Sequence, residues 1–486
     1  MGAIIAVIGK KEESVVETAV RMLKTPNLKN TEAVGIGSPF ATKIEKNDDA
    51  LQCKVNSQTI IGHLFSRTLV SHETQFIKLK KATLIFEGRF YPTNLGISDA
   101  YTVTEKMEQN PNKVAMTLVK ECEGYFAFII AEPGRLTAGR DSLGIQSLYY
   151  GENTKWAALS SELKALWKIG IEKAFSFPPG HIAFVDKNGF KFLPVKTLSY
   201  SKPKRTTMQA AVKKLQRLLQ KSINQRVAGL KEVAVAFSGG LDSSIIAFLA
   251  KKTGVDVHLT HVSLANQLET EYAKTVAEEL KLPIHVHLYS EENVKEILPK
   301  VLWLIEKPDP IQTGIGIPIY WAAETMSETK FKVVLAGQGA DELFGGYKRY
   351  VDNYLRYGKE KAQETISSDI LRLHEINFER DTKICNFHNV DLRLPFATYE
   401  IAKFALDLPL ELKIEPSNNS LRKLLLRQVA KDLDLPKLVV EKPKKAIQYT
   451  TGISKVLERL AKKQRLPISE YLQQIFQKSL KEMNST

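Results

Sequence analysis

The chain has 486 residues and a formal net charge of +15, with 43% hydrophobic and 25% charged residues. This length predicts about two or three globular units, and the composition excludes a disordered chain. The three cysteines, Cys53, Cys122 and Cys385, lie far apart, which excludes a CxxC metal site and a disulfide framework and favours a reducing compartment.

The apolar run AIIAVIG at the start of the sequence is short, and no later stretch approaches the roughly 18 apolar residues that a membrane-spanning helix needs. The run lacks a basic leader and a small-residue cleavage site, so we expect a cytoplasmic protein without a signal peptide. The lysines are spread over helical segments such as AVKKLQRLLQKS rather than gathered among aromatic residues. We therefore expect a solvated basic surface and do not expect nucleic acid as a partner.

The first part of the chain, residues 1–200, has the pattern of a strand-rich domain. Short apolar or alternating runs are separated by Gly, Pro and Asn-Gly, and DKNGFKF is typical of a hairpin. Two helical patterns, ESVVETAVRMLK and VAMTLVKECEG, interrupt these runs. The pattern predicts an α+β domain dominated by antiparallel sheet.

The second part, residues 201–486, changes character after the polar, linker-like stretch LSYSKPKRTTMQ. The predicted strands VAVAF, VHLTHVSL, IHVHLY and KVVLAG alternate with predicted helices such as SSIIAFLAKKTG and ETEYAKTVAEELKL. This alternation predicts an α/β domain with a doubly wound parallel sheet, followed by a mainly helical part after Tyr347.

The strand VAVAF ends in Ser238-Gly239-Gly240, and we expect a helix to begin at about Asp242 to Ser244. Glycines let a ligand approach the backbone closely, and the N–H groups at a helix start attract an anion. Asp242 would repel phosphate unless it held a divalent cation that bridges the phosphates. The motif predicts a phosphate site that is not a Walker A loop; the simpler alternative is a glycine-rich turn with an aspartate cap.

The stretch VVLAGQGADELFGGYKRY again leads from a strand into a glycine-rich turn, here with the adjacent acids Asp341 and Glu342. The carboxyl ends of parallel strands share one edge of a sheet, where such sheets bind ligands. We therefore predict that Asp341 meets Asp242 across one Mg²⁺. The alternative is that the acids cap the following helix.

These residues resemble known families. The SGGLDSS segment resembles the motif of PP-loop ATP pyrophosphatases, which bind the pyrophosphate end of ATP and activate a carboxyl oxygen as an adenylate. Together with the acidic turn, DLRLPF and the stretches SLRKLLLRQVAKDLDLP and EKPKKAIQYTTG, it resembles the synthetase domain of asparagine synthetases and the related β-lactam synthetases. RDSLGIQSLYYG, SSELKAL and FPPGH resemble the class II glutamine amidotransferase half, which implies an Ntn-hydrolase-like fold for the first domain.

The resemblance implies ATP and Mg²⁺ as cofactors, aspartate as the carboxylate substrate and ammonia as its partner, and it leaves a homodimer open. It implies that Asp242 and Asp341 hold the metal and that Lys444 stabilises the pyrophosphate or the acyl-transfer transition state. Further residues are implied to lie around the nucleotide: Ala236, Ser238, Gly239, Gly240, Asp242, Ser243, Ser244, Val262, Ala336 and Gly337.

The first domain departs from the amidotransferase pattern at its reactive residue. In that family the mature chain begins with a cysteine that attacks the glutamine amide, whereas this chain has Gly2. Glu87-Gly88-Arg89 stands where the family has Asn-Gly-Glu, although Ser98-Asp99, a remnant of the substrate-amine contact, is retained. We therefore predict a preserved fold without glutaminase activity, and ammonia that comes from solution or from a partner.

The synthetase half departs at Gln338, where asparagine synthetases carry glutamate and β-lactam synthetases carry tyrosine. A glutamine cannot act as a carboxylate base, but it can orient a nucleophile or donate to an oxyanion, so Gln338 is a second catalytic candidate. The stretch IQTGIGIPIY also lacks the Thr-Thr-x-Arg of typical asparagine synthetases. The prediction is an amide-forming ligase that acts on aspartate; the alternatives are lactam closure or another acid, a tRNA-modifying PP-loop enzyme, and a protein with a dead site.

Overall fold

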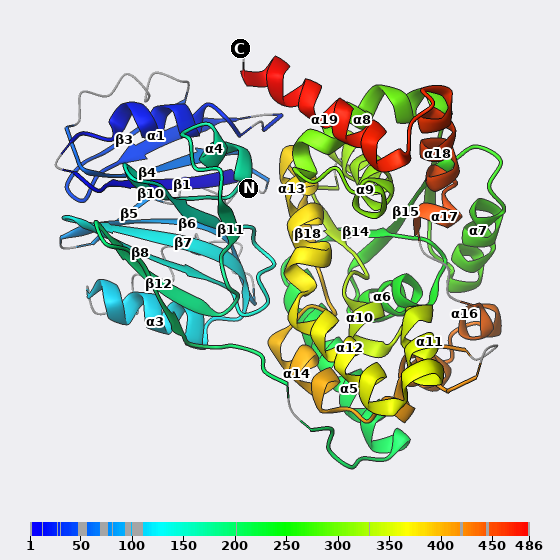
Figure 1. Ribbon diagram of the computed structural model, residues 1–486. Helices are drawn as coiled ribbons and strands as arrows, with labels where there is room; N and C mark the ends of the chain where they lie inside the picture. The colour runs from blue at the N-terminus through cyan, green and yellow to red at the C-terminus, as the bar shows by residue number, and fades with distance from the viewer. Residues whose placement is uncertain are drawn as a thin grey trace. The chain divides into compact units, whose positions relative to one another are not determined.

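The structure, a computed structural model, describes most of the chain. The described residues are 2–11, 13–26, 28–29, 31–46, 56–68, 76–79, 81–92, 99, 110–200, 202–329, 331–417, 421–443 and 447–484. The chain divides into two compact units, one formed by Met1–Thr197 with Asn386–Asp391 and the other by Leu198–Cys385 with Leu392–Thr486 (Figure 1). Among the described residues, no helix has both the length and the apolar character that a membrane crossing requires.

The first unit contains two β-sheets whose paired strands run antiparallel, so the prediction of an α+β fold is confirmed. The seven-stranded sheet has the order β11-β9-β10-β1-β4-β2-β3, and the six-stranded sheet has the order β13-β12-β8-β7-β6-β5. The first sheet comprises β1 (Gly2–Gly9), β2 (Ala33–Gly37), β3 (Thr42–Glu45), β4 (Thr59–Phe65), β9 (Tyr149–Glu152), β10 (Trp156–Ser160) and β11 (Ala174–Ser176). The second comprises β5 (Phe76–Leu79), β6 (Ala82–Phe90), β7 (Gly124–Glu132), β8 (Arg135–Arg140), β12 (His181–Asp186) and β13 (Gly189–Pro194). The accompanying helices are α1 (Val16–Leu23), α3 (Pro111–Glu121) and α4 (Leu163–Trp167).

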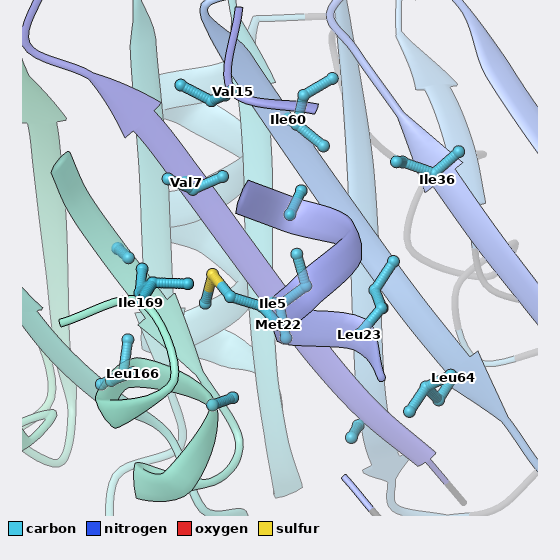
Figure 2. Packing of buried hydrophobic residues seen from close by; sticks show 14 of the residues in the cluster. Ile5, Val7, Val15, Met22, Leu23, Ile36, Ile60, Leu64, Leu166 and Ile169 are labelled. Atoms are coloured by element: carbon cyan, nitrogen blue, oxygen red, sulfur yellow. The ribbon is translucent and has the colours of Figure 1, made fainter. Parts of the chain in front are cut away.

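Strand β1 is apolar throughout because both of its faces are buried. Ile5 and Val7 belong to a cluster with residues of α1 and α4, which lie on one side of the first sheet (Figure 2). Ile4 and Ile8 point the other way and pack with residues of β6, β7 and β8 between the two sheets. Burial of an isoleucine side chain contributes about 1.5–3 kcal/mol, so this continuous apolar run anchors the amino-terminal strand in the centre of the unit.

The hairpin predicted from DKNGFKF is confirmed, because β12 and β13 pair antiparallel with Asp186 opposite Gly189. The predicted helical patterns also form helices: α1 is shorter than its pattern, and α3 has the same length as its pattern but begins three residues earlier. Helix α3 begins at Pro111 after Asn110, whose side chain accepts hydrogen bonds from two backbone N–H groups of the first turn.

The second unit contains a five-stranded sheet in the order β16-β15-β14-β17-β18. Strands β14 and β15, β15 and β16, and β14 and β17 pair in parallel, as the alternation of strands and helices predicts. The strands are β14 (Glu232–Ala236), β15 (Asp256–Leu264), β16 (Ile284–Tyr289), β17 (Val333–Leu335) and β18 (Asp391–Arg393). The α/β fold of this unit is therefore confirmed.

Helices cover both faces of the parallel sheet. The His261 side chain of β15 contacts Thr270 of α7, whereas the Tyr289 side chain of β16 contacts Thr325 and stacks on Trp321 of α9. Tyr289 pairs in register with Leu264 and so shares the face opposite His261. The helices associated with the sheet are α5 (Met208–Val227), α6 (Leu241–Lys251), α7 (Leu268–Leu280), α8 (Glu291–Ile305) and α9 (Pro310–Glu328).

The remainder of the second unit is mainly helical, as predicted. Its helices are α10 (Ala340–Phe344), α11 (Lys348–Tyr357), α12 (Lys359–Leu371), η2 (His374–Phe378), α13 (Glu379–Phe387), α14 (Tyr399–Asp407), η3 (Leu410–Leu412), α15 (Leu424–Asp432), α16 (Lys437–Glu441), α17 (Ile447–Thr450), α18 (Ile453–Lys463) and α19 (Ile468–Asn484). One sequence expectation is slightly off: α6 begins at Leu241 rather than at Asp242 to Ser244, because Gly240 is the last residue with extended backbone angles.

Candidate active site

The predicted phosphate loop, Ser238-Gly239-Gly240, connects the end of β14 to the start of α6. Gly239 has a φ of 68°, a conformation that favours glycine. The Ser243 hydroxyl accepts a hydrogen bond from the Ser238 N–H at 3.4 Å and donates one to the Gly240 carbonyl at 3.2 Å. No side chain of the described residues caps α6, so the N–H groups of its first turn can receive an anion.

The second predicted loop, which we call the acidic turn (residues 336–346), lies against the phosphate loop. It follows β17, which pairs in parallel with β14, so both loops leave the same edge of the sheet. The two loops touch: a Cβ atom at Gly337 would lie 3.0 Å from the Cβ atom of Asp242. Asp341 lies in the first turn of α10. The fold therefore brings together the two motifs that the sequence separates by about a hundred residues.

The carboxylates of Asp242 and Asp341 converge on one cation, the ammonium group of Lys423. Its Nζ atom lies 2.7 Å and 2.6 Å from the two carboxylate oxygens of Asp242 and 2.7 Å from Oδ1 of Asp341. The Lys423 side chain is 2% exposed, and the aspartates are 17% and 18% exposed. Sequence reasoning missed Lys423, because nothing in SLRKLLLRQ distinguishes it from a solvated lysine.

Gly346, at the end of the acidic turn, leaves the space that this arrangement needs. A Cβ atom at Gly346 would lie only 1.9 Å from Oδ1 of Asp341 and 2.5 Å from Cε of Lys423. The Gly346 N–H also donates to the Asp341 carbonyl at 2.7 Å. Any side chain at this position would push the carboxylate and the lysine apart.

A buried arginine, Arg427, fixes the segment that carries Lys423 to the segment that follows α15. Its guanidinium donates to the Arg422 carbonyl at 2.7 Å, to the Lys442 carbonyl at 2.9 Å and to the Val440 carbonyl. This clamp was also missed from the sequence, because its carbonyl partners carry no side-chain signal.

The segment around Lys442 lies beside the phosphate loop through α7. The Lys442 ammonium lies 3.0 Å from the centroid of the Tyr272 ring, and the Tyr272 hydroxyl donates to the Leu438 carbonyl at 3.0 Å. A Cβ atom at Gly239 would lie 3.1 Å from that same ring. Burial raises the pKa of Tyr272 to about 12, so it stays a neutral donor. The predicted catalytic residue Lys444 lies outside the described residues, and its role stays a prediction.

Gln338, the other catalytic candidate, belongs to a buried polar network under the acidic turn. Its side chain lies close enough to the Asp381 carboxyl to lower the pKa of that group, and this carboxyl pairs with Nε of Arg380 at 2.7 Å. Arg380 donates in turn to Oε1 of Gln312 at 2.7 Å. Burial raises the pKa of the Asp381 carboxyl, although Arg380 and Gln338 act in the opposite direction. The Gln338 side chain therefore lies beside the Asp381 carboxyl of this network.

Glu342, adjacent to Asp341, faces the interior instead of joining the cation site. Its carboxyl accepts hydrogen bonds from the Tyr347 hydroxyl at 2.5 Å and from the Asn377 amide at 2.7 Å. Burial raises its pKa, and the charge of Asp341 adds to the effect. The two adjacent acids thus have different roles, one at the site and one in the core.

The other predicted nucleotide contacts lie near the same edge of the sheet. Ala236 ends β14, Val262 lies two residues before the end of β15, and Ala336 directly follows β17. The Ser244 side chain is fully buried in α6. Their contacts with a nucleotide stay predictions. His261 was not predicted: it hydrogen-bonds the Phe237 carbonyl at 2.9 Å and so braces the start of the phosphate loop.

In the first unit, Gly2, the predicted position of the missing nucleophile, is closely surrounded by Glu87, His63 and Leu64. The Gly2 N–H donates to Oε1 of Glu87 at 2.9 Å, and Nε2 of His63 lies 2.9 Å from Oε2 of Glu87. A Cβ atom at Gly2 would lie 2.0 Å from the Leu64 carbonyl oxygen. A cysteine therefore has no room here, which the sequence did not reveal.

Arg89 and Asp99, which the sequence predicts at substrate-binding positions of an amidotransferase, bind each other. Arg89 donates to the Asp99 carboxylate at 3.0 Å, and the two side chains are 5% and 7% exposed. Burial favours a neutral Glu87, but the charge of the amino terminus, the His63 hydrogen bond and Arg89 outweigh it and lower the Glu87 pKa. Cys53 and Ser98 lie outside the described residues.

Comparison with known proteins identifies the family of the chain. The profile of the asparagine synthase family matches residues 214–362 and 354–483, and a glutamine amidotransferase domain profile matches residues 86–168. A protein of Methanocaldococcus jannaschii, described as a glutamine-hydrolysing asparagine synthetase, is 34% identical over 75% of this chain and 76% of its own length. The chain belongs to the asparagine synthase family. Its enzyme class is that of a carbon–nitrogen ligase, and this family uses ATP.

More distant members of the asparagine synthase family align over less of their length. A glutamine-hydrolysing asparagine synthetase of Triphysaria versicolor is 27% identical over 69% of this chain and 59% of that protein, so the chain matches less than two thirds of this plant relative. Among solved structures, an allosteric regulatory enzyme of purine biosynthesis is 13% identical, with a TM-score of 0.35 over 59% of this chain and 80% of that one.

Proposed function

We propose that the protein is an ATP-dependent ligase that adenylates the side-chain carboxylate of aspartate and converts it to the amide with ammonia. The observation that carries the proposal is the convergence of Asp242 and Asp341, from two sheet-edge loops, on a single cation at 2.6–2.7 Å. Carboxylates that already share one cation beside an anion-binding helix start are suited to a magnesium–triphosphate complex.

The residues present fit both cofactors. Carboxylate oxygens are the ligands that Mg²⁺ prefers, and Asp242 and Asp341 bring theirs within bonding distance of the same point. Bound there, Mg²⁺ would neutralise the charge that develops on the departing pyrophosphate. The N–H groups of the first turn of α6 would bind phosphate oxygens, and Ser243 keeps the loop in the shape that exposes them.

The reaction then has two steps. The substrate carboxylate oxygen attacks the α-phosphorus of ATP and the bond to the β-phosphate oxygen breaks, so pyrophosphate leaves. The ammonia nitrogen attacks the acyl carbon, AMP leaves with the carboxylate oxygen, and the nitrogen loses a proton. The cationic groups of this site, Lys423 and the predicted Lys444, would stabilise the charge on the leaving pyrophosphate.

The proposed ammonia source is solution or a partner protein rather than glutamine. Gly2 supplies no thiol, its neighbours leave no room for one, and Asp99 is occupied by Arg89. A cytoplasmic location and a homodimeric assembly also remain part of the proposal.

The test measures AMP and pyrophosphate with ATP, Mg²⁺ and aspartate, and compares ammonia with glutamine as nitrogen donor. We expect asparagine and stoichiometric AMP with ammonia, and no glutamate release with glutamine. Robust glutamine hydrolysis would contradict the assignment of the first unit, and absence of AMP with every acid would contradict ligase activity.

A second candidate function keeps the adenylation step and changes the acid, including ring closure of the β-lactam synthetase type. The observation that favours it is Gln338 itself, which lies beside the buried Asp381 at a position where asparagine synthetases carry glutamate. Pyrophosphate release across a panel of amino and dicarboxylic acids separates the two candidates. A strong preference for an acid other than aspartate would favour the second.

A further inference from the structure

We propose that Lys423 is an internal counter-ion that occupies the metal position of the nucleotide-free enzyme and makes divalent-cation binding dependent on nucleotide. The inference deepens the proposed function and rests on it, because it assumes that Asp242 and Asp341 hold the metal. It concerns the order in which the site is assembled rather than the chemistry that the site performs.

The ammonium group of Lys423 hydrogen-bonds both oxygens of Asp242 and forms an ion pair with Asp341. Lysine has three N–H donors, and Nζ of Lys423 has three carboxylate oxygens within 2.7 Å, two from Asp242 and one from Asp341. The side chain is 2% exposed, so this charge has exchanged water for the two aspartates. Removal of a buried charge from such partners is costly unless another anion receives it.

The backbone holds Lys423 in this position. Lys423 has a φ of 61°, unusual for a residue with a side chain, and directly precedes α15. The next residue, Leu424, donates its N–H to the Lys413 carbonyl at 3.0 Å, and the Lys423 carbonyl accepts from the Arg427 N–H at 3.0 Å. The Arg422 carbonyl on the other side of Lys423 accepts a hydrogen bond from Nε of Arg427 at 2.7 Å, so the backbone is held on both sides of this residue.

Electrostatics prevents the lysine and a divalent cation from sharing these oxygens. A cation bound to both aspartates would lie within a few ångströms of Nζ, where like charges repel strongly in a partly buried site. A free cation must therefore displace Lys423 without any compensating partner. A triphosphate supplies the anionic oxygens that can receive the displaced ammonium, so nucleotide and metal should bind cooperatively, and the coupling must be reciprocal.

The experiment measures Mn²⁺ binding to the full chain by electron paramagnetic resonance, with and without α,β-methylene-ATP, which is not cleaved between its α- and β-phosphates. We expect weak Mn²⁺ binding to the wild-type protein alone and binding at least about tenfold tighter with the nucleotide. In Lys423→Met, Mn²⁺ alone should bind about tenfold tighter than to the wild type, and the effect of the nucleotide should shrink.

Two further variants separate this mechanism from misfolding and from general charge effects. Lys423→Gln keeps a polar side chain without the charge and should shift Mn²⁺ affinity in the same direction as Lys423→Met. Lys295→Met removes an exposed positive charge on α8, outside the candidate site, and should change the affinity by less than about twofold. Melting curves identify any variant that fails to fold.

The outcomes are distinguishable. Equal Mn²⁺ affinities of the wild type and both Lys423 variants without nucleotide would overturn the role of Lys423 while the metal site stands. Absence of Mn²⁺ binding to all proteins even with nucleotide would overturn the metal site itself and this inference with it.

Discussion

Each of the two units holds a cluster of acidic and basic side chains at its predicted active site, but the two clusters differ in what their carboxylates bind. In the second unit, the Lys423 ammonium pairs with both carboxylates, and we propose that a nucleotide-bound metal can replace it there. In the first unit, the Glu87 carboxylate accepts a hydrogen bond from the Gly2 N–H, and the Asp99 carboxylate is paired with Arg89. A retained fold can therefore keep one site whose bound cation a ligand can replace, while the charged groups of the other site become part of the core.

The largest effect is expected from loss of a carboxylate at the proposed metal site of the second unit. Asp242→Asn removes a carboxylate of the proposed metal pair, and we expect ATP cleavage to AMP to fall by about a thousandfold. Asp256→Asn, at an exposed aspartate on β15 outside the site, is the matched control and should keep wild-type rates. Comparable activity of the two variants would show that Asp242 has no role in cleavage.

The next largest effect is expected from loss of the buried ion pair between Arg89 and Asp99. Arg89→Met leaves Asp99 buried without its arginine, and we expect the free energy of unfolding of this unit to fall by about 3 kcal/mol. Urea unfolding followed by hydrogen exchange of the β6 amides measures the loss. The double variant Arg89→Met with Asp99→Asn should recover part of it, and full additivity of the two substitutions would argue against the pair.

A smaller effect tests whether the first site can be reopened. Gly2→Cys should not produce glutaminase activity, because its Cβ atom would collide with the Leu64 carbonyl oxygen. We expect destabilisation of about 1–3 kcal/mol from this overpacking, measured by urea unfolding. Glutamate release by the variant, with correct removal of Met1, would show that the strand relaxes and that only the thiol is missing.

The smallest effect concerns acid stability. The folded-state pKa of Glu87 is lowered, so its contribution to stability is full above its unfolded pKa near the ordinary value of 4.5 and is lost as pH falls through the folded value. Glu87→Gln should therefore lower stability at pH 7 and flatten the loss of stability below about pH 4.5. Parallel urea midpoints of variant and wild type from pH 7 to pH 3 would contradict this assignment.

Much of the second site was predictable because its signals are local. Ser238-Gly239-Gly240 and the acidic turn each follow a strand directly, and the rule that parallel strands bind ligands at their carboxyl edge places both loops together. Lys423 was not predictable, since it lies 181 residues from Asp242 and nothing in the stretch SLRKLLLRQ points to that aspartate. Gln338 was singled out as a departure, but its contact with Asp381 required the structure.

For the first unit, the sequence by itself determined that the strand-rich fold persists and that residue 2 carries no thiol. Hydrophobic periodicity and turn residues decide strands and helices through short-range geometry, which a sequence displays. Only the tertiary structure decided that Glu87, which also contacts His63, lies at Gly2. It also decided that Arg89 pairs with Asp99 and that Lys423 pairs with the two aspartates. These pairings span from 10 residues for Arg89 and Asp99 to 181 for Lys423 and Asp242, and their strength comes from burial and distance, which the order of residues does not display.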